Sequence, residues 1–174
     1  MVNEKLQQFE RAVMPHLDAA YNLARWLTRN DHDAEDLVQE AYLRAFKFFG
    51  GFHGVDARAW LMAVVRNTCY TWLKQRQHRD ATAPFDEEFH SGDGDAFNPE
   101  KLVMQQADRE LLRDVLEELP LEYREVIVLR ELEGFSYKDI AVIADIPLGT
   151  VMSRLTRARK RLECQLLRRL GEEG

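Results

Sequence analysis

The sequence predicts an all-α fold made of two small helical domains. Apolar residues recur at helical spacing before and after a central stretch, and no segment of any length shows the strict alternation of a strand. The central stretch, residues 81–100, is rich in acids, glycine and proline and has little periodicity, which is typical of a linker. We therefore expect domains at residues 8–80 and 101–170, joined by an acidic linker.

Charge is distributed unevenly along the chain. The 174 residues carry a formal net charge of −6, which is not the average of a nucleic-acid-binding protein. However, residues 148–170 hold seven arginines and lysines against one acid, Glu163. This focused positive charge predicts a DNA contact near the C-terminal end, and the acidic remainder would limit non-specific DNA affinity.

The first domain is expected to begin with a helical stretch over residues 4–29, in which Pro15 kinks the helix or starts a new one. The run Asn30–Asp33 is a turn and capping signal, so the next helix should follow it and continue to about Phe48. The apolar face expected for that helix consists of Ala34, Leu37, Val38, Ala41, Ala45 and Phe48.

Glycines make residues 50–56 a predicted loop, and Asp56 can cap a helix over residues 57–79. One face of this helix can build a core; it holds Trp60, Leu61, Val64, Val65, Thr68 and Trp72. A second face mixes cations with an aromatic ring, and such a mixture suits a nucleic-acid strand because bases stack on rings while phosphates pair with cations. The alternative is an ordinary solvated helix with a buried tryptophan.

In the second domain we expect helices over residues 99–118 and 121–133, separated by Pro120 and ended by Gly134 as a C-cap. Residues 136–162 then predict two helices joined by a tight connection, a helix-turn-helix.

Capping chemistry defines both helices of this motif. Ser136 can cap the first helix with Asp139 three residues on, and Pro147 suits the start of the second. The second helix carries an apolar stripe of Val151, Leu155, Ala158 and Leu162. Beside it runs a polar stripe of Thr150, Arg154, Arg157 and Arg161. A helix that packs on its own domain while lying in a DNA major groove needs both stripes.

The sequence gives no sign of a metal, a cofactor or a membrane span. Cys69 and Cys164 lie far apart within predicted helices and have no neighbour at metal-ligand spacing, so we expect two buried structural thiols. Apolar runs fall short of a membrane span and the N-terminus has no signal-peptide core, which predicts a cytoplasmic protein without direct membrane insertion.

Several blocks of the chain resemble the characteristic segments of bacterial sigma factors, in the right order and spacing. They are residues 33–46, 59–61 leading into 65–67, 119–126, 134–141, 149–155 and 157–162. As a whole the chain resembles the extracytoplasmic-function (group four) sigma factors, which keep only the second and fourth sigma domains. The resemblance spans about residues 10–170.

The resemblance implies that residues 33–46 form the helix that grips the coiled coil of the RNA polymerase β′ clamp. The polar residues expected at that contact are Asp36, Gln39, Glu40 and Arg44. An acidic helix face suits a basic partner, although a solvated face with an intrahelical Glu40–Arg44 pair remains the alternative. The resemblance also places residues 119–129 against the polymerase β flap.

By the same resemblance, residues 52–56 and the helix after them open the minus-ten promoter element and capture a flipped-out base. Candidates for the pocket wall are Phe52, His53 and Val55. Candidates for strand contacts are Arg58, Arg66, Asn67, Tyr70 and Lys74. Trp60 is expected to pack in the core, and His53 has no second ligand spaced to make it a metal group.

The helix-turn-helix would read the minus-thirty-five element as duplex. Arg154 and Arg157 are expected at base edges or nearby phosphates; Thr150 and Ser153 lie beside them, and Lys160 and Arg161 contact phosphates. Two residues depart from the family pattern. Asp145 stands where the family usually has glycine, and Pro147 replaces the usual capping hydroxyl; we expect the turn to survive with a slightly altered recognition-helix angle.

These expectations amount to a promoter-specificity subunit of RNA polymerase that does no covalent chemistry, uses no cofactor and is held by a cognate anti-sigma factor. One rival is a dimeric helix-turn-helix regulator of the response-regulator output type, which leaves residues 33–46 unexplained. Another is a helical metal-dependent hydrolase built on His16, His32, Asp33 and Asp36, which lack the paired His-Asp spacing of such a site.

Overall fold

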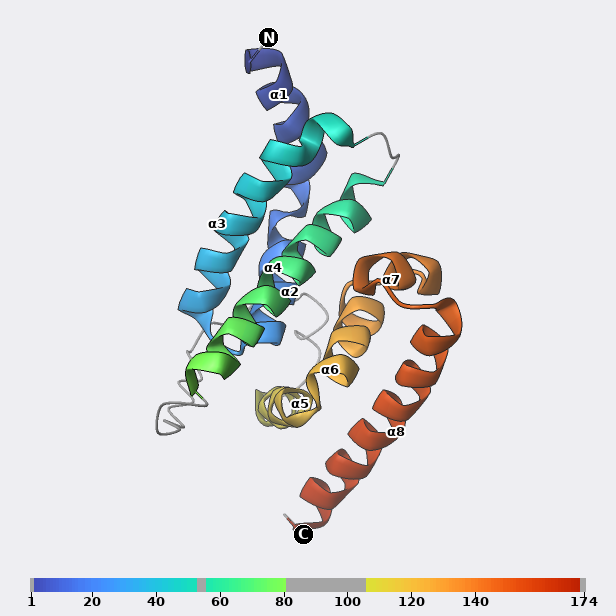
Figure 1. Ribbon diagram of the computed structural model, residues 1–174. Coiled ribbons are helices and arrows are strands. Elements are labelled where there is room, and N and C mark those ends of the chain that lie inside the picture. Colours follow the sequence, from blue (N-terminus) through green and yellow to red (C-terminus); the bar gives the residue numbers. More distant parts are fainter. Residues whose placement is uncertain (1, 53–55, 81–105, 173–174) are drawn as a thin grey trace. The chain divides into compact units, whose positions relative to one another are not determined.

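A computed structural model describes residues 2–52, 56–80 and 106–172 of the chain, and every regular element within these ranges is helical (Figure 1). This confirms the predicted all-α fold. The chain divides into two compact units, one built around α1 to α4 and the other around α5, α6 and α8. The predicted linker, residues 81–100, lies outside the described residues, so its ends stay predictions.

Among its described residues, the first unit contains four α-helices and two short 3₁₀ turns. They are α1 (Val2–Val13), η1 (Met14–His16), α2 (Leu17–Thr28), α3 (Asp31–Phe48), η2 (Phe49–Gly51) and α4 (Ala57–Asp80). Pro15 lies inside η1 and α2 starts directly after it, as the proline predicted. α2 packs against both α3 and α4, and α3 packs against α4 (Figure 1).

The predicted caps of the first unit form. The Asn30 side-chain oxygen accepts a hydrogen bond from the Asp33 backbone N–H at 3.0 Å, and Asp56 accepts one from the Ala59 N–H at 3.0 Å. Each satisfies a donor that the first turn of a helix would otherwise leave unpaired.

The core of the first unit lies where α2, α3 and α4 meet. Its fully buried residues include Leu23, Leu27, Leu61, Met62 and Val65. The five upstream members of the apolar face predicted for α3 are all buried, but Phe48 is 63% exposed, so its assignment to that face is wrong. Phe48 is the last residue of α3 and lies beyond the last buried alanine of the stripe, where the partner helices no longer cover it.

The second unit is built from α5 (Gln106–Glu118), α6 (Leu121–Ile127), a π-helical turn (Val128–Leu132) and α8 (Leu148–Glu172). Along the chain, α7 (Tyr137–Ala144) lies between the π-helical turn and α8. α5 and α6 both pack against α8. Residues before Gln106, where the sequence placed the start of α5, lie outside the described part.

The helix-turn-helix forms as predicted. The Ser136 hydroxyl oxygen accepts a hydrogen bond from the Asp139 N–H at 3.1 Å, and the Pro147 carbonyl accepts from Thr150 and Val151 at 3.0 and 3.1 Å. Asp145 adopts the left-handed conformation with φ of 54°, so this turn does accept aspartate at that position. Of the predicted apolar stripe, Val151, Leu155 and Ala158 are fully buried and Leu162 is half-buried.

The two cysteines differ. Cys69 is fully buried in α4, as expected, whereas Cys164 is exposed, so the expectation of two buried thiols is wrong for Cys164. Cys164 follows Leu162 by two residues, which turns its side chain about 200° around α8 from the packed face. Separately, within the described residues no helix is long and apolar enough to cross a membrane.

This difference predicts the thiol chemistry of the folded protein. Burial, with a smaller effect from the charge of Glu40, raises the pKa of Cys69 to about 12. Iodoacetamide at pH 8 should therefore alkylate Cys164 alone in the native protein and both thiols in denaturant. Mass spectrometry of the digested protein checks this, and rapid native alkylation of Cys69 would contradict the packing of α4.

Candidate polymerase and nucleic-acid interfaces

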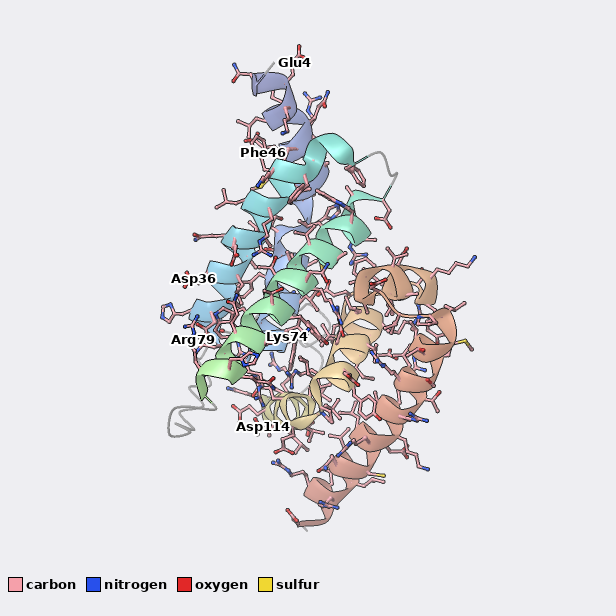
Figure 2. The ribbon with its side chains drawn as sticks, in the orientation of Figure 1. Glu4, Asp36, Phe46, Lys74, Arg79 and Asp114 are labelled. Atoms are coloured by element: carbon pink, nitrogen blue, oxygen red, sulfur yellow. The ribbon has the colours of Figure 1, made fainter. Side chains whose placement is uncertain are left out.

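The outward face of α3 gathers the polar residues predicted to bind a partner. Its inward face is fixed by the buried Ala34, Leu37 and Ala41, and the opposite face presents exposed side chains. All four predicted contact residues are among them, namely Asp36, Gln39, Glu40 and Arg44. Figure 2 labels Asp36 on the side of α3 that faces away from α4.

Glu40 and Arg44 pair with each other, as the alternative interpretation of this face anticipated. The Arg44 guanidinium donates to the Glu40 carboxylate at 2.7 Å, and both side chains are nearly half exposed. Such an i,i+4 pair in water is worth only a few tenths of a kcal/mol. The pair therefore leaves both groups available to a partner at little cost.

Leu43 is the residue of this face that the sequence interpretation missed. It is 73% exposed, the highest value among the exposed large apolar residues, and lies about 180° from the buried Ala34–Ala45 side of α3. Glu40 and Arg44 flank it along the helix. The signal was present in the sequence, since Leu43 stands seven residues after Asp36 and two after the buried Ala41, on the polar side of the period.

The basic and aromatic face predicted for α4 exists. The Arg66 guanidinium lies 3.7 Å from the centroid of the Tyr70 ring. Arg76 lies 5.2 Å from the centroid of Trp72, a ring expected on the core face that is only half-buried. Asn67 and Lys74 are exposed, and Arg58, Arg66 and Tyr70 are half-buried. Figure 2 labels Lys74 and, nearer the C-terminal end of α4, Arg79. Rings paired with guanidiniums can offer both stacking and charge to a nucleic-acid strand.

Phe52 belongs to an aromatic cluster at the end of η2. Its ring lies 4.9 Å from the ring of Trp60 and 6.1 Å from that of Phe49, which in turn lies 5.5 Å from Phe9 of α1. Trp60 is half-buried within this cluster, so the core assignment is only partly correct. His53 and Val55, the other pocket candidates, lie outside the described residues.

Near the start of α4, Arg58 acts on a neighbouring histidine. Burial, followed by the charge of Arg58, lowers the pKa of His16, and Asp56 opposes the shift. His16 therefore favours its neutral form here. No group of three possible metal-ligating side chains comes together within the residues that the structure describes.

On α8 the predicted residues fall into two groups. Ser153, Arg157, Lys160 and Arg161 are exposed, whereas Thr150 and Arg154 are half-buried. The Arg154 guanidinium lies 3.9 Å from the Glu122 carboxylate of α6 and its side chain is 22% exposed. Arg154 is thus turned toward its own unit, while Arg157 and Lys160 face outward.

Other cations of α8 help to hold the second unit together. Arg159 donates two hydrogen bonds to the Glu131 carboxylate, at 2.6 and 3.0 Å, and this bonding, followed by that to Tyr137, raises the pKa of Arg159. Arg169 pairs with Glu118 of α5. Part of the positive charge noted in the sequence is therefore neutralised internally, which the count of charges alone did not reveal.

Both units match known protein families. The family described as Sigma-70 region 2 matches residues 12–79, and the one described as Sigma-70, region 4 matches residues 109–162. The ECF RNA polymerase sigma-E factor of Escherichia coli (strain K12) is 37% identical over 138 residues, which cover 75% of this chain and 72% of that protein. The chain belongs to the ECF RNA polymerase sigma factors. As a sigma factor it binds core RNA polymerase and promoter DNA and directs promoter-specific initiation of transcription.

Further relatives agree. The sigma factor SigE of Mycolicibacterium smegmatis is 30% identical over 167 residues, 96% of this sigma factor and 65% of the relative. The sigma factor RpoE of Bartonella quintana, solved with the anti-sigma factor NepR, superposes with a TM-score of 0.73 at 29% identity and covers 92% of this chain and 97% of that one. CnrH, solved with the cytosolic domain of CnrY, has a TM-score of 0.62 at 22% identity and shares the fold.

Proposed function

We propose that this sigma factor is a two-point promoter clamp, with domains at residues 8–80 and 101–170 that divide the work. The first holds core polymerase and opens the minus-ten element, and the second binds the minus-thirty-five duplex. The linker over residues 81–100 joins them. Two modest DNA sites joined in one chain gain affinity through effective concentration, so full promoter activity needs both.

The observation that carries this proposal is the outward face of α3. An exposed apolar side chain, Leu43, is surrounded by the polar residues Asp36, Gln39, Glu40 and Arg44. An apolar centre within a polar rim is the usual anatomy of a protein interface. We assign this face to the coiled coil of the β′ clamp, where its acids suit a basic surface.

A second polymerase contact, to the β flap, is restricted by the burial of α6. Within residues 119–129 only Pro120 and Glu122 are exposed, and Leu121 and Tyr123 are half-buried. Any contact of this segment with the flap therefore uses residues 120–123, at the start of α6.

The minus-ten element is assigned to α4 and the turn before it. The strand contacts are Arg58, Arg66, Asn67, Tyr70 and Lys74, which lie along the face described above. For the wall of the pocket the proposed residues are Phe52 and, outside the described part of the chain, His53 and Val55. Extruding a base costs a few kcal/mol, which stacking on aromatic rings and pairing of phosphates with cations can offset.

The minus-thirty-five element is assigned to the outward side of α8. Arg157, Lys160 and Arg161 supply exposed cations, and Ser153 supplies a hydroxyl. Thr150 and Arg154, which are half-buried, are proposed to contact DNA at the edge of this surface. Because Arg154 lies close to Glu122, its most favourable role is a phosphate contact at the rim rather than a central base contact.

Control by a cognate anti-sigma factor, in the cytoplasm, completes the proposal. The Bartonella quintana relative was solved with such a partner. In this chain the exposed Leu43 and Phe48 of α3 offer apolar surface that a partner could cover. The sigma factor itself does no covalent chemistry, and the polymerase supplies catalysis.

The test is reconstitution with core RNA polymerase. The full chain should co-elute with core in gel filtration and, on genomic DNA fragments, produce discrete run-off transcripts that core alone does not produce. A chain that ignores core but binds palindromic DNA as a dimer would instead support a stand-alone regulator and overturn the proposal.

A further inference from the structure

The face of α8 that points away from its own unit is less basic than the sequence suggested. Val151, Leu155 and Ala158 are fully buried and so fix the inward side of the helix. The exposed residues between Gly149 and Lys160 are Gly149, Met152, Ser153, Thr156, Arg157, Arg159 and Lys160, and of these Arg159 is paired with Glu131 of its own unit. Cations occupy only the C-terminal end of this set. The exposed side chains at its N-terminal end, which follows the tight turn after α7 (Figure 1), are uncharged and are small, polar or apolar.

Met152 is the apolar member of this face. Its side chain is 51% exposed, while the stripe arginine Arg154, two residues on, is turned toward Glu122. A long, flexible thioether on a DNA-facing helix offers hydrocarbon contact and no hydrogen-bond donor.

Two hydroxyls beside Met152 have their protons already engaged. The Thr156 hydroxyl donates to the Met152 carbonyl at 3.0 Å, and the Ser153 hydroxyl donates to the Thr150 carbonyl at 3.1 Å. Thr156 stands one turn after Met152, so the two side chains are neighbours on the helix surface. With its proton engaged within the helix, Thr156 can offer a base its methyl group.

We propose that Met152, with the methyl group of Thr156 beside it, reads a thymine methyl group in the major groove of the minus-thirty-five element. This inference rests on the proposed role of α8. In the major groove the C5-methyl of thymine is the apolar feature that distinguishes a base pair, and apolar side chains are its natural partners. Further along the helix, Arg157 then contacts a phosphate or a neighbouring base, and Lys160 contacts a phosphate.

The experiment uses the holoenzyme and a minus-thirty-five element selected from a randomised promoter library. Each thymine of that element is replaced in turn by deoxyuridine, which removes only the methyl group. With the wild-type protein, one such replacement should reduce transcription at limiting holoenzyme about fourfold, the change expected for one buried methyl group. With Met152→Ala the same replacement by deoxyuridine should not reduce transcription any further. With Met152→Leu, which keeps a hydrocarbon chain, the replacement should still reduce transcription.

Lys160→Ala serves as the matched control on the same face. It should lower transcription from all templates alike and leave the fourfold uracil effect intact, because a phosphate contact carries no base preference. A selected element without thymine, or uracil tolerated at every position by the wild type, overturns the inference. So does a uracil effect that survives Met152→Ala. A wild-type holoenzyme that selects no upstream element at all would overturn the proposed role of α8 as well.

Discussion

Replacing Leu43 with aspartate should remove most of the affinity of the sigma factor for core RNA polymerase. Leu43 is 73% exposed at the centre of the α3 face, so the substitution leaves the core of the first unit untouched. In the complex it would place a charge where the proposed interface is driest. Truncating a hot-spot residue near the centre of an interface typically costs about 2–4 kcal/mol, which corresponds to a thirtyfold to thousandfold loss of affinity. Titration of labelled protein against core measures this directly.

The matched control is Leu167→Asp. Leu167 is also an exposed leucine, 62% exposed, and belongs to α8 of the other unit, which contributes no residue to the proposed α3 contact. The Leu167→Asp substitution should therefore change the affinity for core polymerase little. Equal affinities for wild type and Leu43→Asp, with both proteins folded, would remove α3 from the polymerase contact.

Truncating Leu155 to alanine should destabilise the second unit alone. Leu155 is fully buried on the inward side of α8, and α8 packs against α6. Leucine-to-alanine changes in cores typically cost about 2–5 kcal/mol, because the cavity adds to the lost transfer free energy. The recognition helix would then be anchored less firmly, and transcription from promoters that depend on the minus-thirty-five element should fall.

Two spectroscopic signals separate the units in this experiment. All three tryptophans, Trp26, Trp60 and Trp72, lie in α2 and α4 of the first unit, so tryptophan fluorescence reports its unfolding alone. In Leu155→Ala, part of the far-UV circular dichroism transition should move to a lower urea concentration, while the midpoint of the fluorescence transition stays unchanged. Leu167→Ala, an exposed leucine on the same helix, should shift neither. A fluorescence shift as large as the dichroism shift would contradict separate unfolding.

Features fixed by local chemistry could be predicted from the sequence. The caps at Asn30, Asp56 and Ser136 and the proline-directed starts of α2 and α8 all formed. Each depends only on residues within a few positions along the chain, so the local sequence is enough to predict it.

Features fixed by distant neighbours could not be predicted. The angle of Phe48 on α3 matches the apolar stripe, but its exposure depends on where the other helices end. Arg154 shares helical spacing with Arg157, yet its proximity to Glu122, thirty-two positions earlier, turns it inward. The outward placement of Leu43, by contrast, follows from its helical spacing, and only the extent of its exposure required the packed bundle.

The most direct test of the two-point clamp is to map the 5′ ends of transcripts made by core polymerase with the full chain on genomic DNA fragments. The clamp predicts start sites absent with core alone, each preceded by two short shared sequences at one fixed separation. The first unit would read the nearer sequence and the second unit the farther one. Start sites identical to those of core alone, or a shared sequence that is a single palindrome, would contradict the two-point clamp.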